Sequence, residues 1–295
     1  MGIPIATRRR ARPYLGTLVE IRADCDSEAS FIASTDAAFA RVANIHRAMS
    51  FHEHTSDLQA IVRCRSGECV NVDDDTWKVL QLALQIEHDS EGIFNPAIAP
   101  SLVRNGLLPQ PVEVGGVPSQ SSLARSIRFE ELLVVRVLQP VWIDLGGVAK
   151  GYAVDAATEA LIEHGVTSGA INAGGDLRVF GDVAQQIHLR HPCSPREHIP
   201  IATLQELSCA TSGDYFVLNQ KTNANAVQTA IIGTRAASAQ RQASVTVIAP
   251  LCAVADALTK VLWLAGIDSE ISRAVLRKYE AQAVALDAHG SATYA

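Results

Sequence analysis

The hydrophobic positions in the first part of the chain follow a strand-like spacing and then a helix-like spacing. Residues 14–23 alternate weakly between apolar and polar side chains and are β-branched, which predicts a strand. Residues 27–50 contain no Gly or Pro and carry apolar side chains at helical spacing, which predicts a helix with one buried face. A short strand is predicted at 68–73, and Asp73–Asp75 should cap a second helix that ends at Gly92.

The second half of the chain changes repeatedly between the two spacings. Residues 132–137 predict a strand. The stretch VWIDLGGVAKGYAVDAATEALIEHGVTSGAINAGGDLRVFG, residues 141–181, then predicts a strand, a Gly-Gly turn, a helix, a strand and a second Gly-Gly turn. Further strands are predicted near 185–190, 199–204, 206–211, 243–250 and 281–288, and further helices at 256–265 and 268–279.

The order of these elements indicates the fold class. Hairpin-like strand pairs are mixed with helices, and the regular strand-helix alternation of a parallel α/β fold is missing. The pattern therefore predicts an α+β fold with mostly antiparallel sheets flanked by helices. Residues 104–122 are rich in Gly, Pro and Ser, which predicts a loop or excursion inside the fold and not a full linker.

Composition and charge narrow the possible partners. The chain has 295 residues, 48% of them hydrophobic, so it can bury a substantial core. Its formal charge of -6 argues against a nucleic-acid partner. No apolar run is long enough to span a bilayer and no signal peptide is visible, so we expect a cytoplasmic protein, or an exported one if the true start lies upstream. The basic run at residues 8–12 is interpreted as a solvated N-terminal arm or as an anion or membrane contact.

The first Gly-Gly turn combines several groups that suit a ligand. Gly146 and Gly147 can take positive φ and bring the backbone close to a ligand. The helix that begins near Val148 offers unpaired N–H groups for an anion, and Lys150 adds a cation nearby. Asp144 could form a hydrogen bond with a hydroxyl or imide group.

The second Gly-Gly turn repeats this arrangement. Gly174 and Gly175 are flanked by Asn172 and Asp176. Together the turns suit a ligand with a phosphate and a polar ring, such as a nucleotide or flavin, although both pairs could also be tight turns made for packing. The GxGxxG fingerprint of dinucleotide-binding folds is not present at either turn.

Seven segments carry a resemblance to a known family. The central stretches DLGGVAKGYAVDAATEAL and GAINAGGDLRVFG closely resemble the central block of the FAD:protein FMN transferases, the ApbE-like family. Other segments resemble further family motifs in the same order along nearly the whole chain: YLGTLVEI (14–21), MSFHEHTSDL (49–58), GIFNPAIAPSL (92–102), ATSGDYF (210–216) and SVTVIAPLCAVADALTKVLWLAG (244–266).

The resemblance implies a flavin transferase. It implies one ApbE-like, T-fold-related FAD-binding domain over residues 1–295. Members of the family use FAD and a divalent cation, usually Mg²⁺, to move FMN onto a Thr or Ser of an acceptor protein, with release of AMP. Some members hydrolyse FAD to FMN and AMP instead.

The resemblance also implies roles for individual residues. FAD contacts are implied for Leu15, His52, Ile93, Phe94, Asn95, Asp144 and Lys150. Metal contacts are implied for Asp256 and for the carbonyl of Gly147, while Asn172 and Asp176 are inferred from the second turn to line the same cavity. We therefore expect the catalytic residues to be Asp256, Lys150 and Asp214, with Thr211 and Ser212 close to them.

Two departures from the family pattern affect the flavin site and the base. His52 replaces an aromatic residue that is often Tyr; its imidazole could lie against the flavin ring or be an exposed turn residue. Residues 223–242 contain no Asp, Pro or His, where many members have an H-x-x-D-P-x-T-G segment that helps to bind flavin. A general base could come from Asp214, His188 or His191 instead.

A third departure follows Asp256. Lys260 stands four residues later, where the family often supplies a metal-binding Thr, and Thr259 comes one residue earlier. Lys260 could turn away while Thr259 or its carbonyl reaches the metal. Alternatively its ammonium could lie on the pyrophosphate and take over part of the metal's work. A protein that binds FAD without transferring FMN, for storage, delivery or sensing, is the alternative function.

Overall fold

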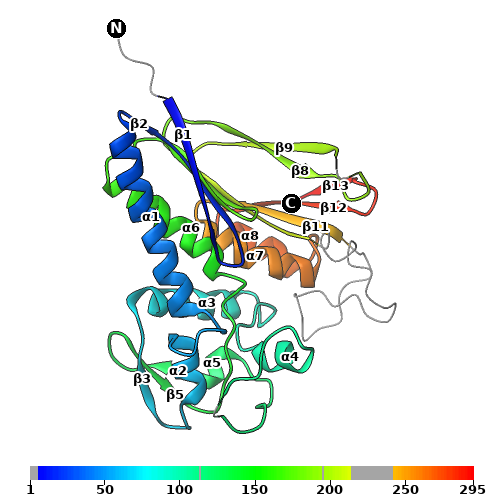
Figure 1. Cartoon of the computed structure of the whole chain (residues 1–295). Helices are drawn as coiled ribbons and strands as arrows, with labels where there is room; N and C mark the ends of the chain where they lie inside the picture. Colours follow the sequence, from blue (N-terminus) through cyan, green and yellow to red (C-terminus); the bar gives the residue numbers. More distant parts are fainter. Residues whose placement is uncertain (1–5, 113, 195, 214–241) are drawn as a thin grey trace.

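The computed structural model describes residues 6–112, 114–194, 196–213 and 242–295. An eight-stranded sheet with the order β1-β2-β6-β7-β10-β11-β12-β13 runs through its centre, and all neighbouring strands are antiparallel (Figure 1). The strands are β1 Ala6–Tyr14, β2 Thr17–Cys25, β6 Gly169–Ala173, β7 Asp176–Phe180, β10 Ser208–Gly213, β11 Gln242–Ala249, β12 Gln282–Asp287 and β13 Ala292–Tyr294.

Helices cover one face of this sheet and a hairpin covers part of the other. Helices α1 (Glu28–Met49), α6 (Ala149–Glu163) and α7 (Cys252–Ala265) lie under the sheet in Figure 1, with α8 (Glu270–Lys278) beside α7. The hairpin of β8 (Gln185–Arg190) and β9 (His198–Leu204) lies on the opposite side. Its buried Ile187 and Leu204 share a small apolar cluster with Leu177 and Val179 of β7. The main core therefore fills the space between the sheet and α1, α6 and α7, and it continues toward Trp77 and Leu80.

A second, smaller group of elements adjoins the far ends of α1 and α6. It contains α2 (Asp57–Arg63), α3 (Asp74–Asp89), α4 (Ala99–Arg104) and α5 (Leu123–Ser126), together with a three-stranded sheet. The strands of that sheet are β3 (Cys69–Asn71), β5 (Val134–Val137) and β4 (Ile127–Phe129), in the order β3-β5-β4.

Elements with local start and stop signals were predicted correctly. Helix α1 begins after Ser27, whose side chain accepts a hydrogen bond from the N–H of Ser30. Helix α3 is capped by Asp73 in the same way; it ends at Asp89, three residues before the predicted Gly92, which has φ +77° in the turn that follows. The antiparallel sheets and flanking helices agree with the predicted α+β class.

The N-terminal residues differ from the expectation. Residues 6–25 form the β1–β2 hairpin, so the predicted strand 14–23 starts too early and the basic run is a strand, not a solvated arm. Arg10 donates to the hydroxyl of Thr35 at 2.6 Å, and Arg12 contacts Asp36 at 2.6 Å while it lies over the ring of Phe39. Arg10 and Arg12 thus find their partners in α1, which no local sequence signal reveals.

Two further predictions need correction. Residues 141–144 are no strand: their apolar side chains are buried, but the N–H of Asp144 donates to the carbonyl of Pro96 in a loop. Helix α7 begins at Cys252, four residues before the predicted start, because its first N–H groups are bound by a side chain from α6. Within the described residues, the helices lack the length and apolar character that a membrane crossing requires.

Candidate active site

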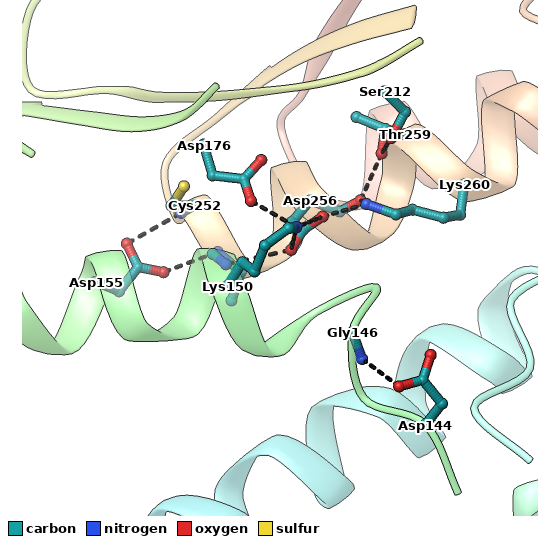
Figure 2. A network of polar contacts seen from close by, with 12 residues as sticks. Asp144, Gly146, Lys150, Asp155, Asp176, Ser212, Cys252, Asp256, Thr259 and Lys260 are labelled. Carbon is teal, nitrogen blue, oxygen red and sulfur yellow. Dashed lines mark hydrogen bonds and ion pairs between the residues drawn. The ribbon is translucent and has the colours of Figure 1, made fainter. Parts of the chain in front are cut away.

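The charged residues singled out in the sequence meet where α6, α7 and β7 come together. Lys150 lies in the first turn of α6, Asp176 begins β7, and Asp256 lies in the second turn of α7. The Nζ atom of Lys150 lies 2.7 Å from Oδ2 of Asp176 and 3.1 Å from Oδ2 of Asp256 (Figure 2). Helix α6 thus supplies one cation to two carboxylates from two other elements.

A second lysine joins this group from α7 itself. Lys260 lies one helical turn after Asp256, and its Nζ atom contacts Oδ1 of that carboxylate and the Asp256 carbonyl at 3.0 Å. Both oxygens of Asp256 therefore contact ammonium groups: Oδ2 contacts Lys150, and Oδ1 contacts Lys260 and, at 3.3 Å, Lys150. We call Lys150, Asp176, Asp256 and Lys260 the lysine layer; its two cations balance its two anions.

Burial separates the anions of the lysine layer from its cations. The side chain of Asp256 is 0% exposed, whereas those of Lys150 and Lys260 are 31% and 17% exposed. Burial alone would raise the pKa of Asp256, but the charges of Lys150 and Lys260 outweigh it and lower the pKa to about 2. The two carboxylates are thus buried beneath the ammonium groups, and the ammonium groups reach toward solvent.

The pKa values of Lys150 and Asp176 are shifted by their charged neighbours as well. Burial favours neutral Lys150, but the charges of Asp176 and Asp256 dominate, so the pKa of Lys150 is raised above its usual value. Asp176 is buried and close to Asp256, and both effects raise its pKa although Lys150 opposes them. Lys150 therefore stays protonated over the whole physiological range.

The N-terminus of α6 binds an anion, and this anion is the side chain of Asp256. The N–H of Gly151 donates to Oδ2 of Asp256 at 3.2 Å. A Cβ atom on Gly151 would overlap the carbonyl oxygen of Cys252 at the start of α7. Gly151 is therefore required for the close approach of α6 and α7 that brings Lys150 to Asp256.

A second set of polar contacts, not foreseen from the sequence, joins the same three elements. Asp155 of α6 accepts hydrogen bonds from the N–H groups of Cys252 at 3.0 Å and Ala253 at 2.9 Å. Arg178 of β7 pairs with the same carboxylate at 2.6 Å. We call Asp155, Arg178 and these two N–H groups the capping layer. The one signal in the sequence is spacing: Asp155 and Arg178 follow Lys150 and Asp176 on the same elements.

Hydroxyl groups connect α7 to β10 beside the lysine layer. Thr259 is fully buried; its hydroxyl donates to the carbonyl of Asp256 at 2.7 Å and lies 2.8 Å from the hydroxyl of Ser212. Thr211 pairs in the same way with Thr246 of β11, at 2.8 Å. The hydroxyl of Thr259, predicted as a metal ligand, therefore takes part in hydrogen bonds inside the protein.

The first Gly-Gly turn differs from its prediction in backbone conformation. Neither Gly146 nor Gly147 has positive φ. Asp144 accepts a hydrogen bond from the N–H of Gly146 at 3.2 Å, and burial raises the pKa of its carboxyl group. A Cβ atom on Gly147 would lie 3.4 Å from the ring of Phe94 and 3.6 Å from Cε of Lys260. Gly147 thus places this turn against the lysine layer.

The second Gly-Gly turn has the predicted conformation. Gly174 and Gly175 have φ values of +67° and +106°. The side chain of Asn172, which is exposed, accepts a hydrogen bond from the N–H of Gly175 at 2.9 Å. A Cβ atom on Gly174 would touch the hydroxyl of Thr17, so this turn packs against the β1–β2 turn that contains Leu15.

The remaining predicted flavin contacts lie in the loops near Asp144. His52 is exposed; burial still raises the pKa of Asp144, although the N–H of Gly146 and the nearby Lys150 and His52 oppose that effect. Asn95 already donates to the carbonyl of Ser121 and accepts from the N–H of Ala97, both at 2.9 Å. Ile93 is half-buried against the core.

The candidate bases are in different positions. Asp214 and nearly all of the interval 223–242 lie outside the described residues. His188 is exposed on β8. His191 accepts from the N–H groups of Cys193 and Ser194 in the loop after β8, and its ring lies beside Gly290. These contacts give neither histidine a place in the lysine layer.

The arrangement of donors does not fit a divalent metal ion. Among the residues that the structure describes, no group of three or more His, Cys, Asp or Glu side chains could hold one. Of the predicted ligands, Asp256 has an ammonium group on each oxygen, and the hydroxyl of Thr259 is engaged. A doubly charged ion beside Asp256 would also be repelled by both lysines.

Comparisons with known proteins agree with this architecture. The model of the ApbE family matches residues 15–285. The chain is 23% identical to a FAD:protein FMN transferase of Haemophilus influenzae, over 77% of this chain and 71% of that protein. The crystal structure of the flavinyl transferase ApbE from Pseudomonas stutzeri, in its apo form, superimposes with a TM-score of 0.78 at 18% identity, and covers 100% of this chain and 97% of its own. The crystal structure of the ApbE protein from Thermotoga maritima superimposes with a TM-score of 0.78 at 24% identity. The match covers 98% of this chain and 96% of that protein. The predicted ApbE-like fold is confirmed.

Proposed function

The chain belongs to the ApbE family, and from that premise we propose that it is a FAD:protein FMN transferase. It would move the FMN half of FAD onto a Thr or Ser hydroxyl of an acceptor protein and release AMP. The relative from Haemophilus influenzae carries the name of this activity. The single observation that carries the proposal is the lysine layer, which presents two ammonium groups in front of buried carboxylates.

The reaction needs little covalent chemistry from the protein. The hydroxyl oxygen of the acceptor attacks the phosphorus on the FMN side, a new P–O bond forms, and the bridging P–O bond breaks. The electron pair of the broken bond leaves with AMP, and the hydroxyl proton passes to a base or to solvent. Lys150 and Lys260 stabilise the negative charge that develops on the phosphate oxygens.

Other residues orient the substrate in this proposal. Asp256 and Asp176 hold the ammonium groups in place, and Asp144 binds a hydroxyl or imide group of the flavin half. His52 contacts the flavin ring and Phe94 contacts FAD, as the family resemblance implies. The same resemblance assigns FAD contacts to Leu15, Ile93 and Asn95, the second turn suggests Asn172, and Asp214 is a candidate base.

Magnesium and the cytoplasmic location stay predictions. When bound in such a site, a divalent cation neutralises a diphosphate and draws charge from the reacting phosphorus. The steps above use the chain's own residues, because the donors around Asp256 do not fit such an ion.

A protein that binds FAD without transfer is the second candidate. The observation in its favour is the absence of Asp, Pro and His from residues 223–242. Such a protein would retain FAD affinity but would lack the group that removes the hydroxyl proton.

One experiment separates these functions. Purified protein is incubated with FAD, with and without an acceptor protein of a characterised relative, and AMP and covalently bound flavin are measured. AMP together with a flavin-labelled acceptor supports the transferase, and AMP without any acceptor indicates hydrolysis. Bound FAD without AMP supports the binding protein. Absence of FAD binding under all conditions would overturn both proposals.

A further inference from the structure

The side chain of Lys260 occupies the space in which a metal ion was expected. Its Cε and Cδ atoms lie 3.6 and 3.8 Å from the position of a Cβ atom on Gly147. Its Nζ atom contacts Oδ1 of Asp256, and the carbonyl of Asp256 at 3.0 Å. The lysine therefore runs from the first Gly-Gly turn to Asp256, the two places where the resemblance implies metal ligands.

Lys150 completes this arrangement from the other side of Asp256. It contacts Oδ2 of Asp256 at 3.1 Å and Oδ2 of Asp176 at 2.7 Å. Two ammonium groups carry the same formal charge as one divalent cation, and here they sit on the carboxylate that would bind that cation. Removal of one ammonium would leave Asp256 partly uncompensated in a buried position.

The two lysines can still donate to a ligand. Each ammonium group has three N–H donors. Lys150 contacts one oxygen of Asp176 and both carboxylate oxygens of Asp256, the longest of these contacts at 3.3 Å, and Lys260 contacts the carboxylate and carbonyl of Asp256. One donor on Lys260 remains, the long contact of Lys150 can be exchanged for a ligand oxygen, and both side chains are partly exposed whereas the carboxylates are buried.

We propose that Lys150 and Lys260 form a built-in replacement for the divalent cation and bind the FAD diphosphate directly, so that the protein works without metal. This inference rests on the proposed function for the identity of the ligand. The two negative charges of the diphosphate diester match the two ammonium groups. The alternative, in which Thr259 reaches a metal, conflicts with its buried hydroxyl, which donates to the carbonyl of Asp256.

The first test measures binding and does not require turnover. FAD is titrated into the full chain by flavin fluorescence, once with EDTA and once with Mg²⁺. Mn²⁺ binding is followed separately by electron paramagnetic resonance, without flavin. We expect FAD dissociation constants that agree within about twofold, which is well under 1 kcal/mol, and no tightly bound Mn²⁺. A tenfold loss of FAD affinity in EDTA, or stoichiometric Mn²⁺ binding, would overturn the inference.

Two matched variants sharpen this test. Lys260→Met keeps the bulk but removes the charge, and should weaken FAD binding about tenfold or more whether or not Mg²⁺ is present. Lys260→Thr removes the shorter of the two ammonium contacts from Oδ1 of Asp256 and adds a hydroxyl, so it should lose affinity in EDTA, recover it with Mg²⁺, and bind Mn²⁺. Circular dichroism checks that both variants fold. Unchanged metal-free affinity in Lys260→Met would contradict the inference.

These experiments can contradict the inference and the proposed function independently of each other. Metal-independent FAD binding without AMP or labelled acceptor contradicts the transferase but supports the inference. AMP release and acceptor labelling that occur only with Mg²⁺ support the transferase and contradict the inference. Failure of the wild type to bind FAD under either condition contradicts both, because the diphosphate would then have no partner in the lysine layer.

Discussion

The lysine layer and the capping layer join the same three elements, α6, β7 and α7, and yet they differ in what they can do. In the capping layer, the anion is Asp155 of α6, which binds two backbone N–H groups and Arg178. In the lysine layer, the anion is Asp256 of α7, and its partners are long side chains that are partly exposed. The capping layer therefore binds backbone N–H groups of α7, and the lysine layer binds the ammonium groups of two lysine side chains.

This difference shows how two neighbouring layers divide the work: the capping layer fixes the position of α7, and the lysine layer is available to bind a ligand. Backbone N–H groups cannot leave Asp155 unless α7 itself moves, so the capping layer fixes the position of α7. Lysine side chains can rotate and exchange a contact within the protein for one with a ligand. Gly151 lies between the layers and lets α6 approach α7 closely enough for both sets of contacts.

The largest effect should come from Asp256, because it organises the lysine layer. Asp256→Ala leaves Lys260 without its carboxylate partner, and transfer should fall about 10²–10³-fold, as expected when a preorganised electrostatic contact is lost. AMP release under saturating FAD measures the change. If AMP release stays at the wild-type rate, Asp256 has no part in the reaction. An intact capping layer should keep the variant folded, as checked by its thermal transition.

Gly151→Ala should disturb both layers together. The new Cβ atom would overlap the carbonyl oxygen of Cys252, so α6 and α7 would have to separate. We expect a loss of about 3 kcal/mol in the free energy of unfolding, accompanied by weaker FAD binding in the folded fraction. Urea unfolding and FAD titration measure the two effects. Ala153→Gly, two residues later on α6, is the control for helix propensity, and should change stability by about 1 kcal/mol without affecting FAD.

Asp155→Ala should affect the capping layer alone. Two N–H groups of α7 lose their acceptor and Arg178 loses its partner, which should lower the free energy of unfolding by about 2–3 kcal/mol. FAD affinity measured well below the transition should change much less than in Asp256→Ala. A large loss of FAD affinity with unchanged stability would show that the two layers are not separate. Asp155→Asn, which retains one acceptor oxygen, should lie between wild type and Asp155→Ala.

The smallest effect concerns pH and reports on the charge state of the lysine layer. The pKa of Asp256 is lowered to about 2, so its ionised form stabilises the fold at neutral pH, and this contribution is lost as pH falls through about 4 to 2. The difference in unfolding free energy between wild type and Asp256→Asn should therefore shrink over that window. Acid-dependent urea titrations measure it, and a constant difference would contradict the lowered pKa.

The parts of the fold predicted from the sequence are those with local signals. Apolar spacing together with caps such as Ser27 and Asp73 defines α1 and α3 within a few residues. The start of α7 was predicted too late because its cap, Asp155, lies almost a hundred residues earlier in the chain. Strand β1 was interpreted as an arm because its arginines find partners in α1, which the charge pattern alone does not reveal.

The candidate site shows the same distinction. The Gly-Gly turns drew attention to Lys150 and Asp176, and the resemblance added Asp256. The roles of these residues stay predictions, but the structure brings all three into contact. The capping layer was missed because its signal, the position of Asp155 and Arg178 after Lys150 and Asp176 on the same elements, does not distinguish them from ordinary helix and strand residues. Lys260 could be interpreted in two ways from sequence, and only its path past Gly147 favours one of them.

The strand order of the central sheet has a consequence for synthesis on the ribosome. Strand β2 pairs with β6, so its second partner lies beyond residues 26–168. At about 5–20 residues per second, the backbone N–H and C=O groups along the open edge of β2 wait roughly 7–30 s for that strand. Helix α1 follows β2 directly and packs against it. We infer that α1 shields the nascent hairpin from aggregation until the rest of the sheet emerges.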